Sequence, residues 1–145
     1  MYLHYAVDGG KAPDLAAERF GLAFTVGSRF RHGEFDLVFT QPDHAITRGL
    51  PKPHLIDETY WRMRGDVSRL NVLGTSLEDN EPQPELWTLE RHKSRIVACI
   101  PGHYTWTFDD PLVRILVFRS ICWAAKLDNP DRLSELALVG ARWTR

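Results

Sequence analysis

The chain has 145 residues, of which 43% are hydrophobic and 11% aromatic, so it is long enough to bury one core and predicts a single globular unit. Its 18 basic and 19 acidic residues are interspersed and leave a net charge of -1, which argues against nucleic acid or an anionic membrane as partner. No apolar run approaches the roughly 18 residues of a membrane span, and residues 1–10 lack the basic and apolar regions of a signal peptide. Cys99 and Cys122 lie in apolar stretches, as reduced core thiols do. These features predict a soluble cytoplasmic protein.

Apolar spacing and turn-forming residues predict the elements of the first half of the chain. They are a short strand at 2–5, a helix at 15–20 capped by Asp14 and ended by Gly21, a loop at 24–33, a half-buried strand at 35–39, a proline-rich loop at 41–53 and a β-prone segment at 55–63.

The second half predicts a strand at 70–75, a polar loop at 78–84 and an antiparallel hairpin of strands 86–90 and 95–100. An aromatic loop then leads into a helix that begins at Pro111 behind a pair of aspartates and runs to about Leu127. A short helix at 131–138 and a tail at 139–145 follow. A strand that leads through a loop into a helix is where α/β folds bind ligands, so this part of the chain is the first place to look for a site.

Three histidines stand at ends of predicted elements or in loops: His4, His32 and His103. Neutral imidazole is both a common transition-metal ligand and a general base near neutral pH, so three converging histidines would form a site. The alternative is that each is separately exposed or hydrogen-bonded to the backbone. The sequence contains no glycine-rich phosphate loop, GxSxG elbow, HExxH helix or spaced Cys/His quartet.

Other candidate residues are carboxylates and aromatics. Asp57 and Glu58 are adjacent, so on a strand only one of them can point into a given pocket, and we favour Glu58 over the alternative that both are solvated. Tyr104, Trp106 and Phe108 alternate and would share one side of an extended loop, either stacking on a sugar ring or packing in the core. Arg48, in the proline-rich loop, could bind an anionic or hydroxylated ligand or cap backbone carbonyls.

Several short motifs occur in the order found in the ThuA-like (trehalose utilisation) family, which this chain resembles from about residue 2 to 126. These motifs are Leu3-His4-Tyr5-Ala6, Phe30 with His32, the segment 43–51 (DHAITRGLP), the segment 57–61 (DETYW), Gly102-His103 and Trp123-Ala124-Ala125.

The resemblance implies a flavodoxin-like α/β fold, a three-layer sandwich related to class I glutamine amidotransferases, and a role in carbohydrate utilisation. It places His4 at the strand-to-helix elbow, where the amidotransferases carry a nucleophilic cysteine, and His103 after the late strand. Because the elbow carries no cysteine here, we expect no glutamine amidotransferase activity.

Two departures from the family pattern matter. Ala45 follows His44 where the family usually has proline, a mild change in loop stiffness. The family domain also carries several elements before the Leu-His motif, so residues 1–127 read as the C-terminal portion of a ThuA-like domain, followed by a short helix and tail at 128–145. An incomplete sheet exposes apolar edges, which predicts a homo-oligomer or a partner chain that covers them.

The leading hypothesis is a protein that binds or transforms a sugar or sugar-derived small molecule. His103, His4 and Glu58 would be catalytic. Ligand binding would involve Trp106, Tyr104, Arg48 and Tyr60, and a divalent metal such as zinc would be held by His4, His32 and His103. The reaction would be a metal-assisted isomerisation or hydrolysis. The rival hypothesis is a non-catalytic, truncated remnant or interaction module that needs a partner chain.

Overall fold

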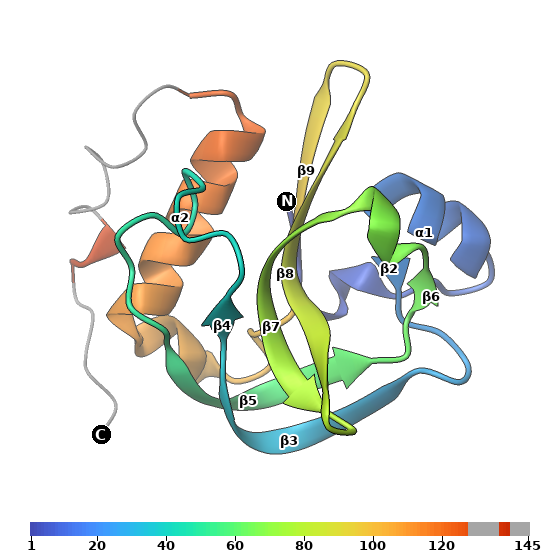
Figure 1. Ribbon diagram of the computed structural model, residues 1–145, viewed down its shortest axis with the longest axis horizontal. Coiled ribbons are helices and arrows are strands. Elements are labelled where there is room, and N and C mark those ends of the chain that lie inside the picture. Colours follow the sequence, from blue (N-terminus) through green and yellow to red (C-terminus); the bar gives the residue numbers. More distant parts are fainter. Residues whose placement is uncertain (128–136, 140–145) are drawn as a thin grey trace.

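Five strands form the central sheet, in the order β1-β9-β8-β7-β4 (Figure 1). The computed structural model describes residues 1–127 and 137–139. The strands are β1 (Tyr2–Leu3), β4 (Val38–Phe39), β7 (Asn71–Glu78), β8 (Glu81–Arg91) and β9 (Ser94–Cys99). β1 runs parallel to β9, and the other neighbours are antiparallel. The predicted hairpin is confirmed as β8 and β9, which pair from Leu86↔Cys99 to Arg91↔Ser94.

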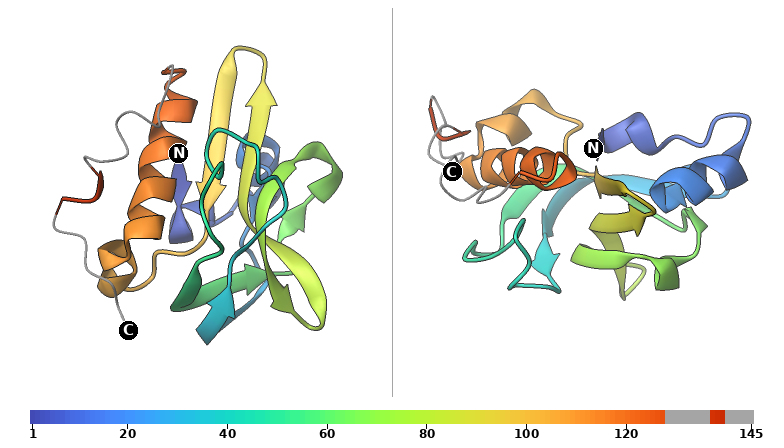
Figure 2. Two further views of the ribbon diagram at one scale, coloured as in Figure 1. Left: turned by 60° about the vertical axis from the view of Figure 1, so that its left-hand side comes forward. Right: turned by 90° about the horizontal axis from the view of Figure 1, so that it is seen from above.

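Helices α1 (Pro13–Phe20) and α2 (Pro111–Ala124) cover opposite faces of this sheet (Figure 2). Along β9 and the residue that follows it, Ile100, successive side chains point to opposite faces of the sheet, which explains why both faces are apolar. Val97 and Cys99 pack in the cluster that includes α2, whereas Ala98 and Ile100 pack in the cluster that includes α1. The predicted α/β class and three-layer arrangement are therefore confirmed.

A two-stranded antiparallel ribbon, β3 (Arg29–Asp36) with β5 (His54–Trp61), lies beside the central sheet (Figure 1). A second small pair joins β2 (Leu22–Ala23) to β6 (Arg64–Gly65). The predicted loop at 24–33 is wrong from Arg29 onward. Most of β3 is polar and at least partly exposed, so it lacks the apolar alternation that marks a strand, and its pairing with β5 gives it its conformation.

The segment at 78–84, predicted as a polar loop, is instead the last residue of β7, a two-residue hairpin turn and the first four residues of β8. Asp79 and Asn80 adopt φ values of 51° and 63°, the left-handed conformation that a two-residue hairpin turn requires and that Asp and Asn tolerate. Pro82 and Pro84 lie within β8, which is allowed because β9 pairs with β8 only from Leu86 onward.

The helix ends follow local side-chain chemistry. Asp110 caps α2, with its Oδ1 accepting from the backbone N–H groups of Leu112 (2.7 Å) and Val113 (3.2 Å). At α1 the predicted capping by Asp14 is wrong: Ala12 is the N-cap, Pro13 occupies the first turn, and Asp14 binds Arg64 instead. Gly21 ends α1 at a φ of 104°, as predicted.

Three short 3-10 helices complete the described elements: η1 (His4–Val7), η2 (Val67–Arg69) and η3 (Thr105–Asp109). The aromatic loop expected to be extended is thus the helical η3. The short helix predicted at 131–138 and the tail at 139–145 lie almost wholly outside the described residues. Within the described part of the chain, no helix combines the length and apolar character needed to cross a bilayer.

Candidate functional site

Glu58 lies at the centre of a cluster of polar side chains from four separate segments. It projects from β5 and is only 5% exposed. His32 stands opposite it on β3, in register. His4 directly follows β1. β9 ends at Cys99, and His103 comes after it, behind Ile100, Pro101 and Gly102. Because β1 and β9 are parallel neighbours, their carboxyl ends meet at one edge and bring these two histidines together.

One oxygen of Glu58 makes most of the contacts. Oε2 lies 3.0 Å from the Tyr60 hydroxyl, 3.1 Å from His103 Nδ1 and 3.2 Å from His4 Nε2. The other oxygen, Oε1, lies 3.4 Å from His32 Nε2. His103 Nδ1 and His4 Nε2 are themselves 3.2 Å apart. The structure therefore brings together five of the residues singled out from the sequence, and the idea that the histidines are separate is wrong.

The orientation of the His4 ring follows from its backbone partner. Nδ1 lies 3.0 Å from the carbonyl oxygen of Ile100, which can only accept, so Nδ1 carries a proton and donates it. In the neutral ring, Nε2 then presents its lone pair toward Glu58. His4 itself has a φ of 50°, unusual for a residue with a side chain, and such strain concentrates at functional sites.

Tyr60 supplies a hydrogen-bond donor that keeps its proton. Burial, together with the negative charge of Glu58, raises the pKa of the Tyr60 hydroxyl well above its usual value. The phenol therefore stays neutral near physiological pH and donates to Glu58 Oε2. Its oxygen also lies 3.2 Å from His4 Nε2, so Tyr60 orients two members of the cluster.

Asp57, the neighbour of Glu58, is fully buried and faces away from the histidine cluster. Its Oδ1 accepts from the backbone N–H groups of Glu58 (2.7 Å) and His103 (2.9 Å). Its Oδ2 accepts from the Gly102 N–H at 2.9 Å and from the Thr107 hydroxyl. These four donors match the four lone-pair positions of a carboxylate, so Asp57 holds the His103 loop in place and has no capacity left for a ligand.

An open hollow of about 510 Å³ lies in front of the cluster, which we call the histidine hollow. His4, Glu58, Tyr60 and His103 form its polar side. Its other side is aromatic and consists of Tyr5, Phe24 and Phe30. Tyr5 and Phe30 are 55% and 54% exposed, so their rings are available to a ligand.

The remaining predicted ligand-binding residues are divided. Tyr104 reaches the cluster, because its hydroxyl lies 3.0 Å from His32 Nδ1. Trp106 stacks on Tyr104 at 4.1 Å between ring centroids but is absent from the lining of the histidine hollow. Arg48 is exposed and also absent from that lining; its loop is bound to α2, where Arg119 donates to the Arg48 carbonyl at 2.7 Å. The structure thus brings Tyr104 to the site and leaves Trp106 and Arg48 outside it.

The chemistry of the cluster fits a divalent metal. His4, Glu58 and His103 each offer one ligand atom, and these atoms lie within 4.8 Å of one another. Two imidazole nitrogens and one carboxylate oxygen are a common zinc ligand set, and the Ile100 carbonyl orients His4 as an outer partner normally does. The metal-binding trio predicted from the sequence, His4, His32 and His103, therefore differs in one member. Glu58 takes the place of His32, and His32 instead contacts Oε1 of Glu58.

A thiolate has no place in this site. Cys99 is buried in β9, and burial together with the negative charges of Glu85 and Asp57 raises the pKa of its thiol to about 12. It therefore remains a protonated core residue near neutral pH. Cys122 is buried in α2.

Sequence reasoning missed the roles of four residues in the site. The clamp made by Asp57 could not be recognised, because nothing in the sequence distinguishes a buried carboxylate from a solvated one. Tyr5 and Phe24 had no signal beyond their aromatic character. The exposed Phe30 had one: it lies two residues from His32, so on a strand it shares that residue's face.

Comparison with known proteins identifies the family. The family model named ThuA, described as trehalose utilisation, matches residues 3–124. The chain belongs to the ThuA family. No match is found among curated proteins.

A ThuA-like protein of Parabacteroides merdae has a crystal structure similar to this chain, with a TM-score of 0.68 and 20% identity. The alignment covers 86% of this chain and 60% of that protein, so the chain spans only part of the length of this ThuA-like relative. The similarity supports the flavodoxin-like fold predicted from the sequence.

Proposed function

We propose that this ThuA-family chain binds a sugar-derived ligand in the histidine hollow and transforms it at a divalent-metal centre held by His4, Glu58 and His103. The observation that carries the proposal is the convergence on Glu58 Oε2, with three polar groups between 3.0 and 3.2 Å away. Isolated carboxylates are not buried without such partners, and a cluster of this kind at the mouth of a hollow is typical of an active site.

The reaction class that suits these residues is isomerisation or hydrolysis of an oxidised sugar. When bound, a divalent ion such as zinc would supply Lewis-acid polarisation of a carbonyl oxygen. The two oxygens of Glu58 divide the remaining work. Oε2 is the oxygen close to His4 and His103 and would join them as a ligand, whereas Oε1, beside His32 Nε2, is the oxygen that can take up or release a proton.

The shape of the hollow supports a sugar as ligand. A pyranose ring has an apolar face and a rim of hydroxyl groups, and the hollow has an aromatic side and a polar side. Phe30 and Tyr5 would contact the ring face, while the hydroxyl groups would meet the polar side formed by His4, Glu58, Tyr60 and His103. The family description, trehalose utilisation, agrees with this choice.

The test is zinc and sugar binding by the purified chain and two histidine variants. Wild type should retain about one zinc per chain after dialysis, held by three protein ligands with one position open to the substrate, and should bind sugar in calorimetry. His103→Ala should lose most of the zinc. His92→Ala, in the turn between β8 and β9, is the matched control and should retain it. Equal zinc content and equal sugar binding in wild type and His103→Ala would refute the proposal.

A second candidate is an interaction module that works with another chain. The observation that favours it is the pairing of β1, which has only β9 as a neighbour within the described residues and lies at an end of the sheet order. An unpaired strand edge invites strand addition by a second copy or a partner. Light scattering would test this: a stable monomer that still binds zinc and sugar would remove the need for a partner.

A further inference from the structure

We propose that a hollow beside Trp106 binds a small organic cation, an aliphatic ammonium ion. This hollow shares no lining residue with the histidine hollow. It is therefore a site of its own, and it can bind its ligand whether or not the proposed function at Glu58 is correct.

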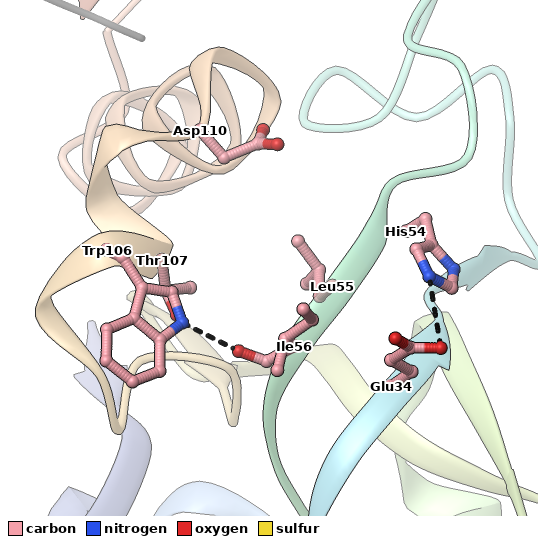
Figure 3. Close-up of a pocket in the computed structure, with 7 residues that line it drawn as sticks. All are labelled: Glu34, His54, Leu55, Ile56, Trp106, Thr107 and Asp110. Carbon is pink, nitrogen blue, oxygen red and sulfur yellow. Dashed lines mark hydrogen bonds and ion pairs between the residues drawn. The ribbon is translucent and has the colours of Figure 1, made fainter. Parts of the chain in front are cut away.

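The hollow has a volume of about 220 Å³ and lies between β5 and the η3–α2 junction (Figure 3). We call it the Trp106 hollow. Figure 3 shows Trp106 and Thr107 on one side of the space, Glu34 with His54 on the other, and the Asp110 carboxylate turned toward it. Leu55 and Ile56 complete the lining. The volume is below the roughly 300–1,000 Å³ of a pocket for a drug-sized molecule, so the hollow suits a small ligand.

The side-chain donors on the Trp106 side of the hollow are already used. The indole N–H of Trp106 donates to the Ile56 carbonyl at 3.0 Å. The Thr107 hydroxyl gives its only proton to the buried Asp57 carboxylate. Neither group can therefore donate to a ligand, which disfavours an anion in this hollow.

The acceptors, in contrast, are open. Asp110 is only 9% exposed and uses Oδ1 to cap α2, whereas its Oδ2 has no hydrogen-bond partner among the described residues. The Glu34 carboxylate lies 4.0 Å from His54 Nε2, too far for a hydrogen bond. His54 Nδ1 donates to Asp36 at 2.9 Å, so in the neutral ring Nε2 carries a lone pair. Buried acceptors normally have a donor, and here the ligand must supply it.

The charge of the lining favours a cation over a neutral donor such as an alcohol. Glu34 and Asp110 contribute two negative charges, and no lysine or arginine lines the hollow. Opposite charges attract more strongly at a partly enclosed site than in open water. The carboxylates therefore select a positively charged donor.

Trp106 adds an aromatic surface that also attracts cations. Tyr104 stacks on one face of its ring at 4.1 Å between centroids, yet Trp106 is still 44% exposed. Tyr104 does not line the hollow, so the indole surface that meets the hollow is not the surface that Tyr104 covers. A cation near an exposed indole face is stabilised by the ring quadrupole.

The apolar part of the wall favours an organic cation over a metal ion. Leu55 and Ile56 offer contacts to an alkyl chain and no side-chain ligand atom to a metal. Within the part of the chain that the structure describes, the only group of His, Cys, Asp or Glu side chains that could hold a metal is His4, Glu58 and His103. An aliphatic amine meets both requirements, because its chain is apolar and its ammonium group carries three donors.

NMR titration of the full chain with 1-butylamine at constant pH tests this inference. The reporter is the indole N–H signal of Trp106, identified as the indole signal that is lost in Trp106→Phe. Butylamine should shift this signal in a saturable way. 1-Butanol has the same alkyl chain without the charge and should shift it far less.

Charge-removing variants locate the site. Asp110→Asn keeps a good N-cap residue and should raise the Kd for butylamine about tenfold, as expected for loss of a hydrogen bond to a charged group. Glu34→Gln should raise it about threefold, because water screens a carboxylate whose side chain is 71% exposed. Glu81→Gln is the matched control, since Glu81 is exposed and does not line the hollow, and it should leave the Kd unchanged.

Two results would overturn the proposal. One is a butanol shift as large as the butylamine shift, or no shift with either compound. The other is unchanged butylamine binding in both Asp110→Asn and Glu34→Gln. If Asp110→Asn fails to fold, Glu34→Gln and the butanol comparison still decide. His103→Ala should bind butylamine as wild type does even if it loses zinc, so failure of one proposal is distinguishable from failure of the other.

Discussion

Replacing Asp57 by Asn should destabilise the chain strongly although the side chain keeps its size. The carboxylate accepts four hydrogen bonds, from the N–H groups of Glu58, Gly102 and His103 and from the Thr107 hydroxyl. An amide has one acceptor oxygen, and its NH2 group would face the donors on the other side. With the NH2 group on the Oδ2 side, Thr107 can rotate and accept, but the Gly102 N–H loses its acceptor. At least one buried donor is therefore left unsatisfied.

The magnitude follows from these contacts. An unsatisfied buried donor costs about 1–3 kcal/mol, and hydrogen bonds to an ionised acceptor contribute about 1.5–3 kcal/mol where neutral ones contribute less. Losing one donor and weakening the others gives an expected loss of about 2–4 kcal/mol in the free energy of unfolding. This is a large share of the roughly 5–15 kcal/mol that stabilises a typical domain.

Urea unfolding at pH 7 measures this loss, and Asp79→Asn provides the matched control. Asp79 also accepts two side-chain hydrogen bonds, from Trp61 and Arg62, but it is exposed, so water can replace them. Its variant should unfold at nearly the urea concentration of wild type. If Asp57→Asn were as stable as Asp79→Asn, the buried carboxylate would not be what holds the His103 loop.

Three further substitutions and treatments probe the core. Burial raises the pKa of Glu85, so the folded state keeps this proton above the unfolded value of 4.5, and the free energy of unfolding of wild type falls as pH rises through that window. Glu85→Gln lacks this titration, so in urea unfolding its stability relative to wild type should increase between pH 5 and 8. A constant difference in stability would refute this. Cys99, with a pKa of about 12, should not react with a disulfide reagent at pH 8 until urea unfolds the chain. Gly21→Ala should lower the free energy of unfolding by more than ~1 kcal/mol, because φ is 104° and the new Cβ would lie 2.5 Å from Leu70 Cδ2. Gly27→Ala, at a φ of 96° with open space around it, should show the backbone cost alone, so equal losses would argue against the clash.

The sequence predicted those parts of the fold whose signals are local. Apolar β9, the aspartate before Pro111 and Gly21 mark a strand, a helix start and a helix end by their own chemistry. The histidines were grouped because His4 and His103 follow predicted strands, and the structure shows their strands to be parallel neighbours.

The parts that sequence reasoning missed depend on pairing between distant segments. β3 is a strand because β5 pairs with all eight of its residues, and its own arginines, histidine and glycine give no alternating pattern. Trp106 was placed at the histidines on the assumption of an extended loop. The 3-10 conformation of η3 turns it toward Ile56 instead. In both cases a tertiary contact decided the outcome.

The short contact between His4 Nε2 and Glu58 Oε2 links the fold to the proposed chemistry. Because Nδ1 of His4 donates to Ile100, neutral His4 offers a lone pair at Nε2, and an ionised Glu58 offers another 3.2 Å away. Two acceptors at this distance repel each other unless a proton or a cation lies between them. Tyr60 can give its single proton to only one of the two acceptors, and His103 Nδ1, which lies 3.1 Å from Glu58 Oε2 and 3.2 Å from His4 Nε2, is the other group able to place a proton there. The backbone that fixes His4 therefore creates a position that attracts positive charge, as a metal centre or a proton-transferring site must.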